Sequence, residues 1–174
     1  MPVRETMPYR PCAGIALFNR DGLVFMGKRL KFVEGELANP WQMPQGGLDK
    51  GEDPATGGLR ELAEETNVTN VNLLRITDDW LTYELPDAAL GVALKGKYRG
   101  QKQKWLAALL TGGDDEIDVE NPMMGAHPAE FSAWEWVPLE ETLVRVVPFK
   151  REVYDEVVRQ FADLPARIRA GEFA

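Results

Sequence analysis

The sequence has little cysteine, little histidine and no long run of apolar residues. Its single cysteine, Cys12, excludes an internal disulfide and is compatible with a reducing compartment. No apolar run approaches the roughly 20 residues that a membrane-spanning helix needs, and residues 1–11 lack the apolar segment of a secretory signal peptide. These absences predict a cytoplasmic protein that does not associate with a membrane.

Positive charge is also scarce, because 20 Lys and Arg side chains stand against 28 Asp and Glu, which gives a net charge of −8. An evenly acidic surface would argue against binding to a nucleic acid. The basic residues are concentrated, however, in an acid-free run over 95–104 and in a second group that comprises Arg145, Lys150, Arg151 and Arg159. Such groups can receive a polyanion. A solvated loop is the alternative interpretation of the first.

The chain of 174 residues, 44% hydrophobic and 28% charged, suits one globular domain over 1–174. Alternating and apolar segments predict strands at 12–18, 23–28, 71–77, 80–85, 104–111 and 133–137. Helical periodicity predicts a C-terminal helix over 149–164, and residues 166–174 are expected to form a frayed tail. Strands combined with one central and one C-terminal helix predict an α/β class fold, an α/β/α sandwich with a mixed β-sheet.

The central helix is predicted between Asp53 and Asn67. Asp53 suits the N-cap and Pro54 the first helical position, while Asn67 can adopt the left-handed conformation that ends a helix. Gly57 and Gly58 are unusual, since each costs about 1 kcal/mol relative to Ala inside a helix. We therefore expect close packing beneath these two glycines.

Three glutamates of this helix, Glu61, Glu64 and Glu65, are spaced so that they share one face. Carboxylates this close repel one another unless cations compensate them, and carboxylate oxygens suit Mg²⁺ or Mn²⁺. Arg60 is placed for an ion pair with Glu64. The alternative interpretation is a solvated acidic face with ordinary surface ion pairs. The spacing as a whole favours a divalent-metal site.

With the loop before it, this helix resembles the signature box of the Nudix hydrolases. The matching residues are Gly46, Glu52, Arg60, Glu61, Leu62, Glu64, Glu65 and Val68. Asn67 stands where the box has Gly, and because Asn tolerates the left-handed conformation we expect the turn to survive. The resemblance implies the Nudix fold and a hydrolase of phosphoanhydride bonds. It also implies two or more Mg²⁺ ions, for which Mn²⁺ or another divalent cation can substitute.

Segments outside the box extend the resemblance over nearly the whole chain, to the bacterial RNA pyrophosphohydrolases and the related asymmetric dinucleoside polyphosphate hydrolases. These segments are 9–11, 41–47, 80–86, 100–105 and 149–154. In that branch a further acidic residue, in a Pro-Glu-Phe sequence, joins the metal site. Here Ala129 is inserted between Pro128 and Glu130, and Glu130 is the candidate.

The resemblance implies a role for each candidate residue. The metal ions are expected to be held by Gly46, through its carbonyl, and by Glu61, Glu64, Glu65 and Glu130. One of these carboxylates is expected to act as general base, and the sequence does not say which. Glu52 and Arg60 are expected to orient the loop and the helix.

Substrate contacts are expected from two further groups of residues. Phosphate is expected to contact Arg10, Arg29, Gln101 and Lys102. The base is expected to lie between Val147 and Phe149, with Tyr83 along the same groove and Lys150 as a further substrate-binding candidate. The alternative for the aromatic residues is a place in the core.

Three functions remain open at this point. The first hypothesis is a 5′-pyrophosphohydrolase that converts 5′-triphosphate RNA to 5′-monophosphate RNA and so promotes mRNA decay. The alternative is cleavage of diadenosine tetraphosphate (Ap4A) into ATP and AMP. A noncatalytic nucleotide- or RNA-binding module is disfavoured, because Glu61, Glu64 and Glu65 are all present. The sequence predicts a monomer and leaves open the preferred metal and whether a protein activator exists.

Overall fold

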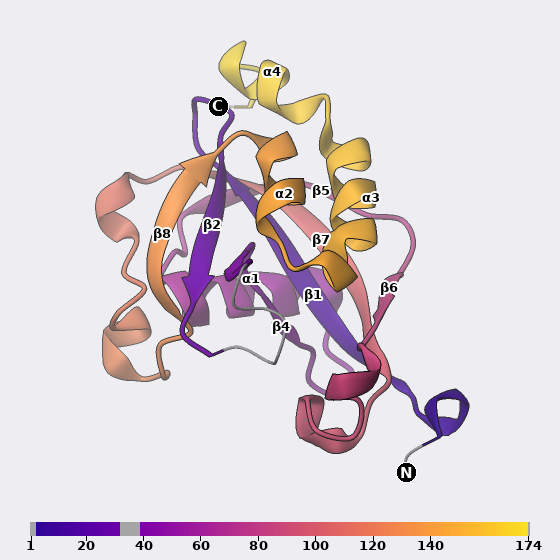
Figure 1. Cartoon of the computed structure of the whole chain (residues 1–174). Helices are drawn as coiled ribbons and strands as arrows, with labels where there is room; N and C mark the ends of the chain where they lie inside the picture. The colour runs from indigo at the N-terminus through magenta and orange to yellow at the C-terminus, as the bar shows by residue number, and fades with distance from the viewer. Residues whose placement is uncertain (1–2, 32–38, 174) are drawn as a thin grey trace.

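The computed structural model describes residues 3–31 and 39–173 (Figure 1). The strands are β1 (Tyr9–Phe18), β2 (Val24–Arg29), β3 (Trp41–Gln42), β4 (Gln45–Gly47), β5 (Val71–Ile76), β6 (Leu81–Glu84), β7 (Gly100–Leu110) and β8 (Phe131–Val137). The α-helices are α1 (Pro54–Thr66), α2 (Thr142–Arg145), α3 (Arg151–Phe161) and α4 (Leu164–Arg169). Short 3₁₀ turns lie at Arg4–Thr6, Asp87–Ala89, Leu94–Gly96, Asp114–Glu116, Pro122–Gly125, Leu139–Glu141 and Pro148–Lys150.

All these strands belong to one mixed sheet. Its main path runs β3-β2-β1-β7-β5, while β4 pairs with β1, β6 with β7, and β8 with β2. β1 and β7 pair in parallel from Tyr9 opposite Gly100 to Phe18 opposite Leu109, and every other pairing is antiparallel. The predicted mixed sheet is therefore confirmed.

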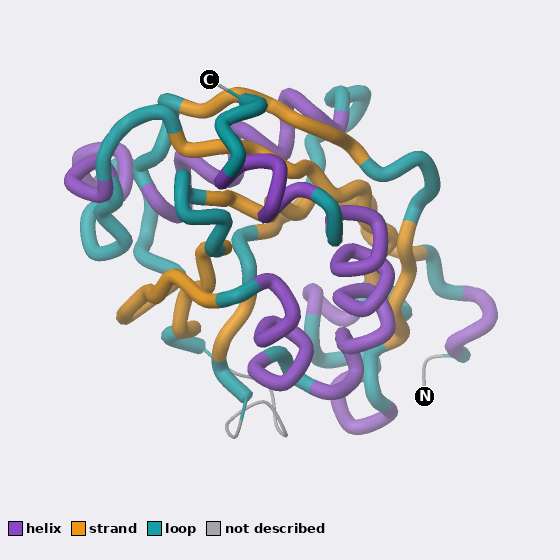
Figure 2. The backbone as a smooth tube through the Cα atoms, turned by 90° about the horizontal axis from the view of Figure 1, so that it is seen from above, coloured by secondary structure: helices purple, strands orange, loops and turns teal. Residues whose placement is uncertain are grey.

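Helices cover both faces of this sheet, as Figure 1 shows, with α1 behind it and α2 and α3 in front. Seen from above in Figure 2, the strands lie between helical segments. Alternation along β1 explains the layering: Leu17 packs in the core cluster that contains Leu62 of α1, and Phe18 in the cluster that contains Val157 of α3. The predicted α/β/α sandwich is confirmed.

The strand predictions differ from the structure at their ends. β1 and β7 begin earlier than expected, at Tyr9 and Gly100, because these two strands pair along their whole length. β3 and β4 were not predicted, since each is too short to show a pattern of its own. The other predicted strands lie within two residues of their expected bounds.

The C-terminal part of the chain is more ordered than the sequence indicates. The expected helix over 149–164 begins as a 3₁₀ turn and continues as α3, and a separate helix, α4, follows. Ile168 is only 5% exposed, and Phe173 packs against the same core cluster. Apolar side chains thus hold α4 and Phe173 against the core, within the segment 166–174 for which a frayed tail is expected. Fraying there stays a prediction, and residue 174 lies outside the described residues. None of the helices among the described residues has the length and apolar character to cross a membrane.

Candidate active site

Helix α1 begins and ends at the residues that the sequence predicts. The Asp53 carboxylate accepts a hydrogen bond from the Thr56 amide at 3.2 Å, and Pro54 opens the helix. Asn67 ends it in the left-handed conformation, at a φ of 70°. The helix start and end predicted from the sequence are thus confirmed.

The two glycines of α1 mark the helix's closest contacts with its neighbours. A Cβ on Gly57 would lie 2.3 Å from a methyl carbon of Leu48, and one on Gly58 would lie 2.8 Å from a methyl carbon of Leu106. The expected close packing is confirmed at both positions. Gly57 lies against the loop that carries the box residues, and Gly58 lies against strand β7 of the sheet. The two glycines lower the helix propensity of α1, but because they have no side chain they allow α1 to approach β7 and the loop closely.

A cavity of about 340 Å³ lies beside α1 and β4. It brings together most of the residues predicted from the sequence to act in one site: Arg10, Arg29, Gly46, Glu61, Glu65, Tyr83, Gln101, Glu130, Phe149 and Lys150. The lining also contains Gln42, Gln45, Gly47, Leu85, Ala93 and Leu94. Residues from distant parts of the chain therefore converge on one cavity that is acidic at α1 and aromatic at the start of α3.

Glu65 is the most buried carboxylate of this cavity, with 6% of the residue exposed. Its Oε2 accepts a hydrogen bond from the Gln45 amide at 3.2 Å. Burial raises the pKa of Glu65 well above its usual value, and the nearby carboxylates of Glu61 and Glu130 raise it further. Burial also raises the pKa of Glu61. The charged forms of Glu61 and Glu65 are therefore costly without a compensating positive charge, and a cation beside them would stabilise both.

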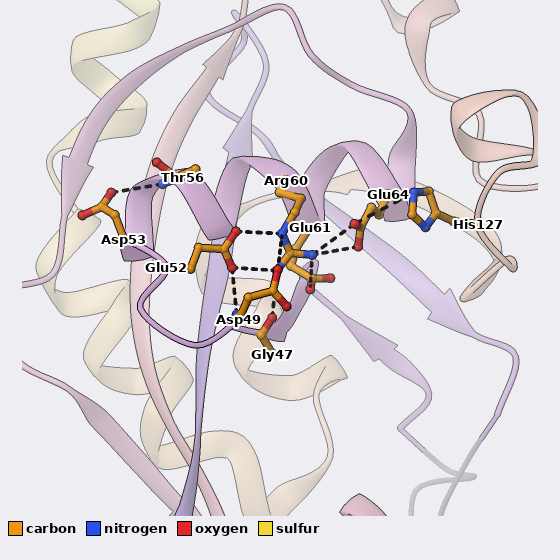
Figure 3. Close-up of polar contacts among 9 residues, drawn as sticks. All are labelled: Gly47, Asp49, Glu52, Asp53, Thr56, Arg60, Glu61, Glu64 and His127. Carbon is orange, nitrogen blue, oxygen red and sulfur yellow. Dashed lines mark hydrogen bonds and ion pairs between the residues drawn. The ribbon is translucent and has the colours of Figure 1, made fainter.

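Arg60 joins the loop, the helix and β4 in one network (Figure 3). Its guanidinium donates to both oxygens of Glu52 at 2.8 Å and to the Gly47 carbonyl at 3.0 Å. It also reaches Glu61 and Glu64 at 3.1 Å. Neither Glu52 nor Arg60 lines the cavity, and Arg60 contacts Gly47 and Glu61, which do; the supporting role of the pair stays a prediction.

Glu64 differs from its predicted place. Both of its carboxylate oxygens accept from Arg60, and one lies 3.9 Å from Nε2 of His127 (Figure 3). It is absent from the lining of the cavity, which Glu61 and Glu65 reach. The ion pair with Arg60 explains the difference, since it draws the side chain along the outside of the helix.

The chemistry of this acidic end fits a divalent cation. Within residues 3–31 and 39–173, no set of three or more carboxylate, imidazole or thiol groups is gathered closely enough to hold one ion. Nevertheless, Glu61, Glu65 and Glu130 line one cavity with hard oxygen donors, and burial, followed by repulsion from Glu61 and Glu130, raises the pKa of Glu65. The backbone of Gly46 lies against Glu61, so closely that a Cβ there would be 2.1 Å from Oε2.

The phosphate candidates separate into two groups. Arg10, Arg29 and Gln101 line the cavity, and Arg10 approaches Gly47 so closely that a Cβ there would lie 2.3 Å from a guanidinium nitrogen. Lys102 is absent from the cavity lining; its Nζ lies 5.1 Å from the centre of the Trp80 ring. Alternation along β7 explains this correction, because neighbours in a strand point to opposite faces.

Basic residues of the run 95–104 also form local contacts. Arg99 pairs with Glu84 at 2.8 Å, and Lys104 donates to the Asp78 carbonyl. In the second basic group, Arg145 pairs with Glu141 at 3.1 Å. Part of the positive charge of both groups is therefore held in local ion pairs and hydrogen bonds.

Two aromatic rings form the wall of the cavity at the start of α3. The rings of Tyr83 and Phe149 lie with centroids 5.6 Å apart at an angle of 45°. Lys150 donates to the side-chain oxygen of Gln42 at 3.0 Å, and its Nζ is 5.7 Å from the Tyr83 centroid and 5.8 Å from that of Phe149. Val147 is 4% exposed in the core and absent from the lining, so the predicted pairing of Val147 with Phe149 around a base is not formed.

The segment 41–47 contributes residues that the sequence interpretation did not assign. Gln45 accepts from Nε2 of Gln103 at 2.9 Å, and Gln42 accepts from Lys150. Tyr154 of α3 accepts from the Met43 amide at 2.8 Å. The density of Gln and Gly over 41–47 is the signal that could have indicated a polar segment held by side chains. α3 thus fixes the strand pair that borders Glu65.

Replacing Tyr154 with Phe is expected to lower the free energy of unfolding by about 1–3 kcal/mol, the cost of leaving a buried donor without a partner. The donor is the amide of Met43, whose side chain is fully buried, and Tyr154 is itself 1% exposed. Urea unfolding followed by fluorescence measures the change. Tyr98→Phe, at a half-buried position, is the control. An equal and small effect of both substitutions would contradict the role of this hydrogen bond.

Replacing Glu52 with Gln is expected to lower the free energy of unfolding at pH 7 by about 1–3 kcal/mol, because charge-assisted hydrogen bonds to Arg60 are lost. Those bonds lower the pKa of Glu52 from 4.5 to about 2. A lowered folded-state pKa stabilises the protein above pH 4.5, and the gain disappears as the pH falls through about 2. The difference from wild type should therefore shrink over this range in urea titrations. A difference independent of pH, or one matched by Glu140→Gln at an exposed position, would argue against it.

Comparison with known proteins gives consistent results. The family description "NUDIX domain" matches residues 8–157. An RNA pyrophosphohydrolase of Brucella abortus is 51% identical over 165 residues, which cover 93% of this chain and 92% of that protein. An RNA pyrophosphohydrolase of Azorhizobium caulinodans is 52% identical over 158 residues, or 90% and 94% of the two chains.

Solved structures with low identity share the fold. A C. elegans Ap4A hydrolase in a binary complex superposes with a TM-score of 0.60 at 19% identity, covering 88% of this chain and 98% of that one. The E. coli dihydroneopterin triphosphate pyrophosphohydrolase superposes with a TM-score of 0.63 at 16% identity, covering 88% and 99%. These similarities show that the chain shares its fold with these solved structures.

Proposed function

Because the chain belongs to the NUDIX family, we propose that it is a hydrolase that removes pyrophosphate from the 5′ end of triphosphorylated RNA. The product is 5′-monophosphate RNA, which is more open to decay. The observation that carries the proposal is the identity of 51% over 93% of the chain to an RNA pyrophosphohydrolase. A cavity with carboxylates at one end and a tilted pair of aromatic rings at the other supports it.

The acidic end of the cavity would bind the metal and the phosphates. Glu61, Glu65 and Glu130 would hold Mg²⁺, with the Gly46 carbonyl and, once released from Arg60, Glu64. When bound, the metal supplies charge neutralisation for the polyphosphate and activation of water. Arg10, Arg29 and Gln101 would hold the phosphate oxygens in place. A carboxylate would take a proton from the attacking water, and a pyrophosphate group leaves.

The aromatic end would hold the nucleoside. Phe149, which is half-buried, offers a ring face for stacking, the buried Tyr83 ring packs against it, and Lys150 adds positive charge close to both. A single base stacked on an aromatic side chain contributes about 1–3 kcal/mol. Because the same rings would stack an adenine, cleavage of Ap4A into ATP and AMP is the second candidate, and the fold shared with an Ap4A hydrolase supports it.

The remaining properties are part of the same proposal. We expect Mg²⁺ in two or more positions, Mn²⁺ as a substitute, and a cytoplasmic monomer that consists of a single domain over 1–174. Activation by a protein partner is left to experiment.

The test compares a short 5′-triphosphate RNA with Ap4A at equal concentration in Mg²⁺. Faster formation of 5′-monophosphate RNA supports the proposal, and faster release of ATP and AMP favours the second candidate. Turnover of neither substrate, with the fold intact by circular dichroism, overturns both and revives the noncatalytic binding module. Removal of the metal with a chelator serves as the blank.

A further inference from the structure

The loop between β7 and β8, residues 111–130, brings one carboxylate to the cavity from outside helix α1. Glu130 is the last residue of this β7–β8 loop and lines the cavity, and its carbonyl accepts a hydrogen bond from the Leu30 amide at 3.0 Å. The other carboxylates of the cavity belong to α1. The distance between Glu130 and those carboxylates therefore depends on how the loop is held against the helix.

The beginning of the loop is held by several bonds close to the end of α1. The amide of Asp118 donates to the Thr66 carbonyl at 2.9 Å. The carboxylate of Glu116 accepts from the amides of Thr69 and Asn70 at 2.6 and 2.9 Å. Removing one of these contacts leaves the others in place, so the first half of the loop does not depend on a single side chain.

The later half of the loop depends on Asn67, the residue that ends α1. Its Nδ2 donates to the Glu116 carbonyl at 3.1 Å, and its Oδ1 accepts from the Met123 amide at 2.9 Å. Among the described residues, the bond to Met123 is the only hydrogen bond that joins residues 119–129 to a part of the chain outside the loop. One side chain therefore links the segment that precedes Glu130 to the helix.

The backbone around Met123 needs such a contact. Met123 and Met124 both adopt the left-handed conformation, at φ values of 55° and 60°, which residues with a Cβ rarely adopt. The side chain of Met124 is 97% exposed, so its packing cannot hold the turn. A backbone in this conformation persists only where its surroundings hold it. Burial of Pro122 and the bond from Met123 to Asn67 are the contacts in place to do so.

The turn at the end of α1 does not itself require an asparagine. Asn67 has a φ of 70°, a conformation that glycine adopts more readily, and glycine is the residue of the Nudix box at this position. A glycine would keep the turn and lose both hydrogen bonds to the loop. The departure of this chain from the box therefore adds a contact between helix and loop that the box residue cannot make.

We propose that Asn67 is a positioning residue of the metal site: its side chain holds the β7–β8 loop against the end of α1 and so fixes Glu130 relative to the carboxylates of the helix. This inference rests on the proposed function, in which those carboxylates share metal ions. Asn67 does not line the cavity, so it acts through the loop. Groups that orient a metal ligand in this way contribute to the affinity for the metal.

The first measurement needs neither metal nor substrate. The amide of Leu30 donates to the carbonyl of Glu130, so its hydrogen exchange, followed by NMR in the metal-free protein, reports whether Glu130 is in place. Asn67→Gly should speed this exchange by about five- to tenfold, the change that corresponds to the loss of one hydrogen bond. The Met43 amide, bonded to the buried Tyr154 hydroxyl, is the internal reference for global opening and should not change.

Two further variants identify the bond that matters. Asn70→Gly is the matched control, because Nδ2 of Asn70 also donates to the loop, to Oε2 of Glu116 at 3.0 Å, but at its beginning. It should leave the exchange of Leu30 unchanged. Asn67→Asp keeps an oxygen that can accept from Met123 and loses the donor to the Glu116 carbonyl. It should keep the wild-type exchange of Leu30.

The second measurement concerns the metal. Binding of Mn²⁺ without substrate, followed by electron paramagnetic resonance, should weaken by about tenfold in Asn67→Gly, the lower end of the effect of removing a group that orients a metal ligand. Asn70→Gly should bind Mn²⁺ as wild type does. In hydrolysis of 5′-triphosphate RNA, Asn67→Gly should need about tenfold more Mg²⁺ for half the maximal rate, with KM for the RNA unchanged at saturating Mg²⁺.

A purely structural role gives a different pattern. It would lower the melting temperature of Asn67→Gly and leave the affinity for Mn²⁺ unchanged, which overturns the inference. Equal changes in Asn67→Gly and Asn70→Gly would mean that any loosening of the loop has this effect, and they also overturn it. If Asn67→Asp loses as much as Asn67→Gly, the bond to Met123 does not hold the loop, and the inference fails.

Failure of the proposed function is distinguishable from these results. If wild type hydrolyses neither 5′-triphosphate RNA nor Ap4A, the proposed function is wrong. The exchange of the Leu30 amide and the binding of Mn²⁺ then still decide whether Asn67 positions Glu130, because neither measurement uses a substrate. If wild type hydrolyses RNA and Asn67→Gly matches it in exchange, Mn²⁺ affinity and Mg²⁺ requirement, only the role of Asn67 is wrong.

Discussion

Replacing Glu65 with Gln is expected to lower kcat by about 10²–10⁴-fold while the fold persists. The amide is neutral, so it can neither share the charge of a bound cation nor accept a proton from water. Its oxygen can still accept the hydrogen bond that the Gln45 amide donates to Glu65 at 3.2 Å. Single-turnover hydrolysis of 5′-triphosphate RNA in Mg²⁺ measures the loss.

The stability of the same variant separates catalysis from folding. Burial and the carboxylates of Glu61 and Glu130 raise the pKa of Glu65, which means that the charged form is unfavourable there without a cation. A neutral amide removes this repulsion, so the melting temperature should stay the same or rise. Glu140→Gln, at an exposed position outside the cavity, is the control for activity. Retention of wild-type kcat by Glu65→Gln would show that the catalytic centre lies elsewhere.

Replacing Gly46 with Ala is expected to lower kcat by about 10²-fold, the effect of misplacing a reacting group by about 1 Å. The new Cβ would lie 2.1 Å from Oε2 of Glu61, so the carboxylate must move. Because the obstructed atom is the far end of a flexible side chain, the free energy of unfolding should change little. The expected signature is therefore a loss of activity without a matching loss of stability, measured by hydrolysis and by urea unfolding.

Gly112→Ala is the matched control for this substitution. A Cβ on Gly112 would lie 2.6 Å from Oε2 of Glu116, which is also the end of a glutamate side chain but lies outside the cavity. The same kind of displacement should leave kcat unchanged there. Equal losses of activity in the two variants would mean that crowding of any glutamate disturbs the enzyme, and that the position of Glu61 carries no special role.

The features that could be predicted from the sequence are those decided by residues close together in the chain. Helix α1 was predicted from Asp53 to Asn67 because capping and left-handed ends are decided within a few residues. The glutamates could be assigned because their spacing is itself the signal. Glu130 reaches the cavity despite the inserted Ala129, and its carbonyl accepts from the Leu30 amide at 3.0 Å, which ties the loop to the end of β2.

What could not be predicted depends on partners far along the chain. Gln101 and Gln103 are buried in β7 because they bond to each other at 2.7 Å, which no pattern of polar residues reveals. The apolar side chain of Val147 suits a core position as well as a binding groove, and only the packing of α2 and α3 decides between them. Glu64 has the right spacing for the cavity, but Arg60 holds it outside.

The parallel pairing of β1 with β7 has a consequence for the order in which the protein can fold during synthesis. β1 leaves the ribosome early, and its partner from Gly100 to Leu110 follows only after the whole of α1, β5 and β6. Closing so long a loop is slow compared with forming a helix. We therefore expect the cavity to assemble only after β7 and the start of α3 have emerged.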